Sequence, residues 1–454
     1  MAATAIHAAV TIGRVAVAAD AGNPMPAQTS PTDIRVSTLD NGIVTVLEQM
    51  PWVHSASLGV WIRAGSACET AETNGVSHLL EHLFFKGTPT RNVREIVETV
   101  EKSGGSANAF TGREHTCLYV KMLDTHLFEG LDLLSDILLN SLFCDFEKEK
   151  QIVLEEISSV NDNPEELLHD LFMADLWPDH PLGFPIAGAR DVVAEIDVDQ
   201  VRNYHKRQYI AENIVVAAAG NFDCDELLRR IEIAFKNVGN GQVCRNPSMP
   251  RPAQGVRRHD REIEQTHISL GAEGISAADD QRYTLAVLSA VLGGTAMSRL
   301  FQRVRENEGL AYSVYSFTSA LERTGVVGIA AAVAPKNLDR TVEIVLDEID
   351  RMRTEPVSAD ELSNAREYLK GSIILGLEST FNRMSRIARS HMYRGEIESI
   401  ETVLERIDSV NAEDILQLAN HVFGPGKEIL TTLGPPREPI ASHILERINP
   451  TATV

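Results

Sequence analysis

The chain contains 454 residues, of which 43% are hydrophobic and 23% are charged, and its formal net charge at pH 7 is -22. It is longer than a usual single domain, and its composition excludes a collagen, a disordered chain or a disulfide scaffold. The acidic charge argues against a nucleic-acid partner, because phosphate recognition normally uses a basic surface. No apolar run reaches the roughly 18 residues of a membrane span, so no membrane partner is expected.

The five cysteines are scattered without a CxxC pair, which favours a reducing compartment over a disulfide framework. The expected location is therefore the cytoplasm. Residues 1–31, rich in alanine and then in proline, serine and threonine, are expected to form a disordered tail. A cleaved targeting peptide is the alternative for this segment, and it would place the mature chain in a mitochondrial matrix or a periplasm.

Beyond this tail, short alternating β-branched runs predict strands, and longer segments with helical periodicity follow them. Helices are predicted over 75–85 and 146–160, among others. The apolar run 213–221 predicts a buried strand near the end of a first domain, which we assign to residues 32–238. A stretch rich in glycine, asparagine and proline then predicts a linker over 239–258.

The second half of the chain repeats the order of elements found in the first half. The strand-like run 266–272 resembles 55–60, and the run 428–434 matches the closing strand of the first domain. A repeated order of this kind indicates a duplicated domain. We therefore predict a homologous second domain over 259–440, followed by a tail over 441–454, and a fold of the α+β class.

The segment His78-Leu79-Leu80-Glu81-His82 lies within the helix predicted over 75–85. Residues four apart share a helix face, so His78 and His82 can present two imidazoles to one metal ion, with Glu81 beside them. Two neutral nitrogen ligands, a carboxylate base and an open coordination position are what a hydrolytic zinc site needs. The alternative is a face with two solvated histidines, but apolar neighbours place them beside a buried stripe. The motif predicts one zinc ion per chain, with Glu81 as the general base.

Three segments, 75–88, 108–111 and 149–157, together resemble the inverzincin zinc peptidases, the family of pitrilysin, insulin-degrading enzyme and mitochondrial processing peptidase. The resemblance covers nearly all of the chain after the tail, and it is greatest to the catalytic type of subunit in the mitochondrial enzyme and its bacterial homologues. It implies two homologous α/β-sandwich domains, each an antiparallel sheet with packed helices, that close like a clam around a cavity. It also implies zinc endopeptidase activity on unfolded peptides or presequence-like segments.

The same resemblance implies a third zinc ligand. In the family this ligand is a glutamate on a later helix, and a further glutamate precedes it by two helical turns. Glu156 and Glu149 match these positions, so Glu156 is expected to bind zinc and Glu149 to orient the ligands. Their spacing places both on one face of the helix predicted over 146–160, and Glu155 is the alternative ligand.

The resemblance further implies residues that contact the substrate. Arg305 and Tyr312 match an arginine and a tyrosine of the family's supporting domain, and both side chains can donate hydrogen bonds to an oxyanion. The run Ala107-Asn108-Ala109-Phe110 resembles the edge strand on which the family's substrates are laid as an added strand. Glu166 and Asp170 match two acids that receive an arginine in the mitochondrial enzymes, so a preference for arginine near the cleaved bond is expected.

The segment 292–298 is short, whereas the non-catalytic partner subunit of the mitochondrial enzyme carries a long glycine-rich loop there. This difference favours a catalytic chain, and the family's habit implies a homodimer or a heterodimer with an inactive homologue. Two other functions stay open. One is a structural or assembly subunit that keeps the fold without the chemistry, and the other is a zinc hydrolase of small molecules.

Overall fold

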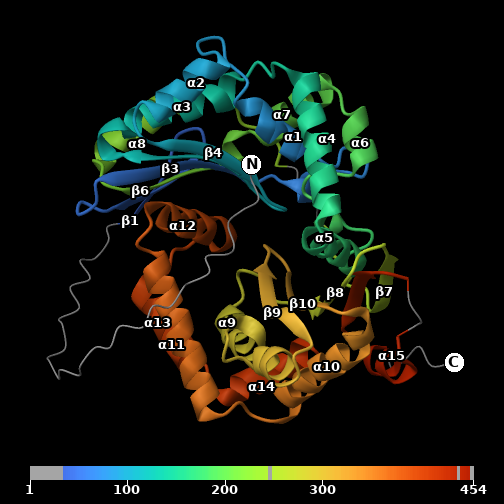
Figure 1. Ribbon diagram of the computed structural model, residues 1–454. Coiled ribbons are helices and arrows are strands. Elements are labelled where there is room, and N and C mark those ends of the chain that lie inside the picture. The colour runs from blue at the N-terminus through green and yellow to red at the C-terminus, as the bar shows by residue number, and fades with distance from the viewer. Residues whose placement is uncertain (1–33, 244–247, 437–439, 450–454) are drawn as a thin grey trace, which may run out of the picture.

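The computed structural model describes residues 34–243, 248–436 and 440–449, which form two domains, each built on one β-sheet (Figure 1). The tail expected over 1–31 lies outside the described residues. Among the helices that the structure describes, none combines the length and the apolar character needed to cross a membrane.

The first domain contains a six-stranded sheet in the order β1-β2-β6-β3-β5-β4. Its strands are β1 (Ile34–Thr38), β2 (Val44–Gln49), β3 (Ser55–Ile62), β4 (Ser106–Thr111), β5 (Thr116–Leu123) and β6 (Ile214–Gly220). Strand β6 is buried along its whole length, as expected for an apolar run with both faces covered. The helices from this half are α1 (Val76–Phe84), α2 (Val93–Glu101), α3 (Leu127–Asn140), α4 (Phe146–Asp162), α5 (Pro164–Leu176), α6 (Arg190–Glu195), α7 (Val198–Gln208) and α8 (Cys224–Phe235).

The second domain contains a five-stranded sheet in the order β7-β11-β8-β10-β9. Its strands are β7 (Gly255–Asp260), β8 (Thr266–Glu273), β9 (Ala311–Ala320), β10 (Gly325–Val333) and β11 (Ile429–Gly434). The α-helices from this half are α9 (Arg282–Ser289), α10 (Leu338–Thr354), α11 (Ala359–Gly376), α12 (Thr380–Arg394), α13 (Ile400–Ser409), α14 (Ala412–Val422) and α15 (Ser442–Ile448). Two π-helical segments, η5 (Ala290–Gly294) and η6 (Phe301–Asn307), lie between α9 and β9.

The two sheets have the same topology. Without β1, the first sheet has the order β2-β6-β3-β5-β4, which matches β7-β11-β8-β10-β9 strand for strand. Each sheet is antiparallel except for one parallel pair, β2 with β6 and β7 with β11. Strands β3 and β8, which contain the similar runs 55–60 and 266–272, occupy equivalent positions. The predicted duplication and the predicted fold class are confirmed.

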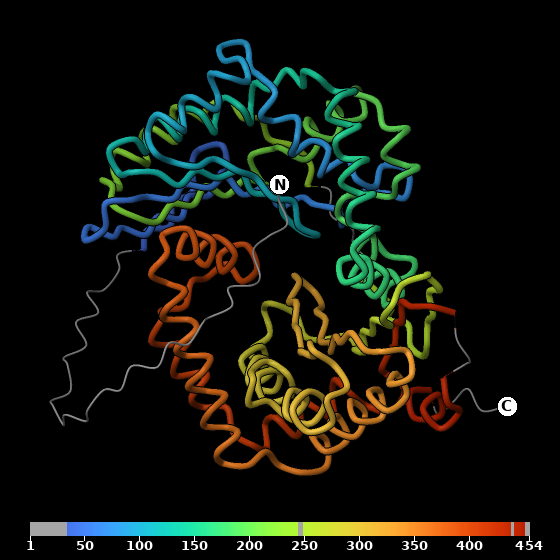
Figure 2. Tube along the Cα trace, in the orientation of Figure 1, coloured from blue at the N-terminus to red at the C-terminus, as the bar shows by residue number. Residues whose placement is uncertain are grey.

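Each domain receives one helix from the other half of the chain (Figures 1 and 2). Helix α5, from the first half, packs Phe172 against Val326 and Ile429 of the second sheet in one apolar cluster. Helix α12, from the second half, packs Met384 in one cluster with Trp61 of the first sheet. This exchange interlocks the two domains.

The domain boundaries predicted from sequence need two corrections. The linker predicted over 239–258 ends earlier, because strand β7 already begins at Gly255. The tail predicted over 441–454 contains helix α15, whose Ile444 and Ile448 are buried in the core of the second domain. A helix of two turns is too short to produce a clear apolar period, which is why the sequence pattern did not reveal it.

Candidate metal centre

Helix α1 carries the His-x-x-Glu-His segment and is buried on nearly every side, with His82 as its one partly exposed residue. The helix begins directly after Gly75, whose φ of 100° favours glycine. A Cβ at this position would also lie 2.5 Å from Val193 Cγ2, so the entry to α1 requires glycine. The local sequence therefore fixes where the helix starts and which residues it presents to α4.

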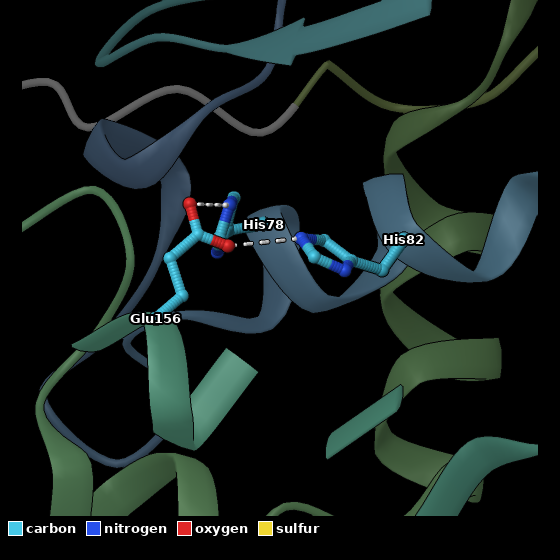
Figure 3. A group of neighbouring side chains, drawn as sticks. All are labelled: His78, His82 and Glu156. Carbon is cyan, nitrogen blue, oxygen red and sulfur yellow. Dashed lines mark ion pairs between the residues drawn. The ribbon is translucent and has the colours of Figure 1, made fainter. Parts of the chain in front are cut away.

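The side chains of His78, His82 and Glu156 point toward one another (Figure 3). Nε2 of His78 lies 3.8 Å from Oε1 of Glu156, and Nε2 of His82 lies 3.4 Å from Oε2. The candidate ligand atoms of all three residues lie within 4.8 Å of one another. The structure thus brings together the three predicted ligands, two from α1 and one from α4. Glu155, the alternative, is exposed and lies outside this group.

The protonation states of this group suit a metal ion. Burial, together with the neighbouring His82, lowers the pKa of His78 to about 4, so its imidazole is neutral at neutral pH. A hydrogen bond from His82 lowers the pKa of Glu156, which keeps its carboxylate ionised. Two imidazoles and one carboxylate form the donor set of many hydrolytic zinc sites, so these residues fit zinc.

Glu81 lies beside this group, on the same turn of α1, and is buried. Burial raises the pKa of its carboxyl group, and a hydrogen bond from Thr111 partly opposes that effect. Thr111 Oγ1 donates this hydrogen bond to Glu81 Oε2 at 2.5 Å. Thr111 is the last residue of β4, so the end of this strand directly contacts the predicted base. Sequence reasoning did not assign Thr111 a role.

Glu149 and Glu156 lie near different ring nitrogens of His82: Glu149 is near Nδ1, and Glu156 is near Nε2. Oε2 of Glu149 is 3.7 Å from His82 Nδ1, and the Glu149 side chain is only 2% exposed. Lys86 Nζ lies 2.9 Å from Glu149 Oε1 and supplies a counter-charge. The structure therefore places Glu149 where a ligand-orienting residue would be. Sequence reasoning assigned no role to Lys86, which lies just after the end of α1, where helical spacing no longer predicts the direction of a side chain.

Two family descriptions match this chain: insulinase (peptidase family M16) over residues 44–190, and peptidase M16 inactive domain over 195–369. A protein named an uncharacterized zinc protease in Streptomyces coelicolor is 37% identical, over 91% of this chain and 92% of that protein. Another of the same description in Bacillus subtilis is 38% identical, over 86% of this chain and 96% of that protein. The chain belongs to peptidase family M16.

Solved structures agree with the M16 fold. A protease from Helicobacter pylori matches with a TM-score of 0.83 at 21% identity, over 89% of this chain and 100% of that chain. A chain of complex III2 from Candida albicans matches with a TM-score of 0.79 at 21% identity, over 88% and 96%. The particular closeness to mitochondrial processing peptidase stays a prediction. Among the described residues, the one three-residue group with metal-ligand geometry lies in the half that matches the insulinase description.

The predicted substrate strand of this M16 chain is at the edge of the first sheet. Residues Ala107, Asn108, Ala109 and Phe110 belong to β4, which pairs with β5 on one side and ends the sheet on the other. Asn108 is exposed and Ala109 is buried, so side chains alternate along the strand. An edge strand can pair with an added extended chain.

The two predicted arginine-binding acids lie one turn apart on α5, but their surroundings differ. Glu166 Oε1 accepts a hydrogen bond from Asn163 Nδ2 at 2.8 Å on the surface. Asp170 Oδ1 lies 4.0 Å from Nη2 of Arg113, a buried arginine whose Nε donates to the Leu182 carbonyl at 2.9 Å. Burial raises the pKa of Asp170, and Arg113 opposes that effect. Asp170 thus already faces a guanidinium of the same chain, whereas no arginine of the described residues forms an ion pair with Glu166.

Arg305 and Tyr312 lie in the second domain, on η6 and at the start of β9. The Arg305 guanidinium is 4.6 Å from the ring centre of Tyr312 and 4.8 Å from that of Phe301. Tyr312 is 81% exposed. The structure brings these two residues together, on a different domain from the metal centre, and their contact with a substrate stays a prediction. Arg305 belongs to a π-helical segment, a geometry that is frequent at functional sites.

Proposed function

We propose that this M16 chain is a zinc-dependent endopeptidase that hydrolyses unfolded peptides or presequence-like segments. The observation that carries the proposal is the convergence of His78, His82 and Glu156, with Glu81 buried beside them. The two relatives described above, each named an uncharacterized zinc protease, support it. A buried carboxylate with a raised pKa beside three side chains of metal-ligand type is an arrangement typical of hydrolytic metal sites.

One zinc ion would be held by Nε2 of His78, Nε2 of His82 and the carboxylate of Glu156. When bound, zinc supplies a Lewis acid that lowers the pKa of water and polarises a peptide carbonyl. Glu81 would act as general base. Thr111 donates a hydrogen bond to Oε2 of Glu81. The other oxygen, Oε1, would therefore take a proton from the attacking water and pass it to the leaving amine. The raised pKa of Glu81 makes it a better base near neutral pH.

Strand β4 would align the substrate. An extended peptide can pair with its free edge, and that edge ends at Thr111, which contacts Glu81. Pairing of this kind needs an extended backbone, which favours unfolded substrates. Arg305 and Tyr312 would donate hydrogen bonds to the reacting carbonyl when a substrate lies between the domains. Glu166 would recognise an arginine side chain, since no arginine in the described part of the chain forms an ion pair with its carboxylate.

The test measures zinc content and cleavage of a quenched, arginine-containing unfolded peptide by the wild type, Glu81→Gln and Glu155→Gln. We expect about one zinc per chain in all three proteins, and a loss of at least ~100-fold in kcat for Glu81→Gln alone. Glu155→Gln is the matched control, because it removes a neighbouring exposed carboxylate. A Glu81→Gln protein as active as the wild type would contradict the proposal.

A structural or assembly subunit of the same fold is the competing function. It would bind zinc without cleaving any unfolded peptide, either alone or after mixing with an inactive homologue. We further propose that the chain acts as a dimer in a reducing compartment. The mass of the purified chain in solution, measured by light scattering, distinguishes a homodimer from a monomer that requires a second kind of subunit.

A further inference from the structure

A buried carboxylate that the proposed chemistry does not use lies at the start of helix α1. Glu69 follows the short helix η1 (Ser66–Cys68) and is 3% exposed. Its Oε2 accepts hydrogen bonds from the Gly75 N–H at 2.8 Å and from Asn74 Nδ2 at 2.9 Å. Its Oε1 accepts from the Ser77 N–H at 2.8 Å. Both carboxylate oxygens are therefore directed at the first turn of the helix that carries the metal ligands.

These contacts replace a cap that α1 lacks. The first N–H groups of a helix have no partner within it, and a side chain at the N-cap usually supplies one. The N-cap residue of α1 is Gly75, which has no side chain to do so. Glu69 accepts hydrogen bonds from the N–H groups of Gly75 and Ser77. The Val76 N–H donates to the Thr73 carbonyl at 3.0 Å. A negative charge at this end also suits the helix dipole.

Keeping a carboxylate in this place costs stability. Burial raises the pKa of Glu69 to about 7 although hydrogen bonds from Gly75, Asn74 and Ser77 lower it, so the cost of burying the charge exceeds the stabilisation from these donors and the helix dipole. An uncharged cap such as serine would satisfy one N–H without that cost. Instead, the carboxylate provides two hydrogen-bond acceptors, Oε2 and Oε1. They fix the positions of the Gly75 and Ser77 N–H groups in the first turn.

The fixed turn precedes the ligands directly. Ser77 is the neighbour of His78, and Ser77 Oγ is 2.7 Å from Tyr204 Oη on α7, a second anchor of the same residue. His82 follows one turn later on the same rigid helix. Glu156 belongs to another helix, so a shift or rotation of α1 would move both imidazoles relative to Glu156.

We propose that Glu69 is a positioning residue for the metal centre, which sets the location of α1 and thereby the affinity of the site for zinc. The inference rests on the proposed zinc site. It goes beyond that site because it concerns a residue that contacts neither the ligands nor a substrate. Supporting residues around metal ligands commonly change affinity by about 10–100-fold when they are removed.

The test measures zinc affinity of the metal-free protein at 25 °C, by competition with a chromophoric chelator. Glu69→Gln replaces one acceptor oxygen with an amide that faces N–H donors, so we expect the zinc dissociation constant to rise about 10–100-fold. Glu428→Gln is the matched control, because Glu428 is a similarly buried carboxylate in the second domain. Its zinc affinity should stay within about twofold of the wild-type value.

A second variant, Glu69→Asp, keeps the inference testable if Glu69→Gln does not fold. Glu69→Asp keeps the charge but withdraws the oxygens by one methylene, so it should also weaken zinc binding while the protein remains folded. Thermal unfolding in excess chelator is measured in parallel. If both Glu69 variants unfold at lower temperature but bind zinc as the wild type does, Glu69 is only structural and the inference is wrong. If the wild type binds no zinc, the proposed function fails as well.

Discussion

A buried ion pair between Glu48 of β2 and Arg383 of α12 links the two halves of the chain. Glu48 is completely buried, and its Oε1 accepts a hydrogen bond from Arg383 Nη1 at 2.6 Å. Its other oxygen has no hydrogen-bond partner within the described structure. We predict that Arg383→Met, which keeps the apolar stem and removes the charge, strongly destabilises the protein.

The expected loss follows from what remains around Glu48. Removing one partner of a buried ion pair costs about 3–5 kcal/mol, because the other charge stays buried and unpaired. Arg386 also interacts electrostatically with Glu48, which offsets part of this cost, so we expect about 3 kcal/mol. The double variant Glu48→Gln with Arg383→Met removes both charges of this pair, so no unpaired carboxylate remains at position 48. It should therefore recover most of the lost stability.

The assay is urea unfolding of the metal-free protein, followed by far-UV circular dichroism and by tryptophan fluorescence. Trp61 lies in the apolar cluster formed with α12, so fluorescence reports on this contact. Arg94→Met is the control, because Arg94 forms an exposed pair with Glu98 and should change stability by less than about 1 kcal/mol. A loss below about 1 kcal/mol for Arg383→Met, or a double variant less stable than the single one, would refute the reasoning.

Three further predictions concern single side chains. Lys86→Met leaves the buried carboxylate of Glu149 without its cation, so zinc affinity measured by chelator competition should fall roughly 10-fold; unchanged affinity would exclude Lys86 from the site. Glu166→Gln should lower the ratio of cleavage rates for arginine and citrulline peptides at least ~5-fold. Asp170→Asn should chiefly lower stability, because Asp170 lies next to Arg113 of the same chain. Equal losses of selectivity in the two variants would contradict this prediction. Burial raises the pKa of Glu428 to about 7, so ionisation of this group lowers stability as pH rises from 5 to 8. Glu428→Gln should then be more stable than the wild type by about 3 kcal/mol at pH 8 and by less than ~1 kcal/mol at pH 5, in denaturant titrations; a gain independent of pH would show another cause.

The grouping of the candidate metal ligands could be predicted from sequence because its geometry is mostly local. His78 and His82 are four apart on one helix, and Glu149 and Glu156 are seven apart on another, so each pair lies on one helix face whatever the rest of the fold does. Bringing the two helices together required the family pattern. The structure then separated Glu156 from Glu155, which periodicity alone had left open.

The sequence pattern could not predict which distant segments contact one another. The apolar periods of α5 and α12 indicated which face of each helix is buried, but not that each helix covers the sheet of the other domain. The partnership of Asp170 with Arg113 joins α5 to the turn after β4, and no local spacing predicts it. The charge that an acidic side chain presents depends on such contacts, which is why Glu166 and Asp170 are not equivalent in the structure.

Helix α12 of the second half contributes to the stability of the sheet beside the candidate metal centre. All three candidate ligands belong to the first half, yet one face of the first sheet is completed by α12 from the second half. Helix α12 fits closely there, since a Cβ on Gly59 would lie 2.9 Å from Met384 Sδ. Without α12, the buried Trp61 would lose its apolar cover and Glu48 its counter-charge. Strand β3, which contains Gly59 and Trp61, pairs with β5, and β5 pairs with β4, whose last residue holds Glu81. Among the described residues, the second domain contributes none of the three candidate ligands, but its helix α12 supports the sheet whose edge strand contacts Glu81.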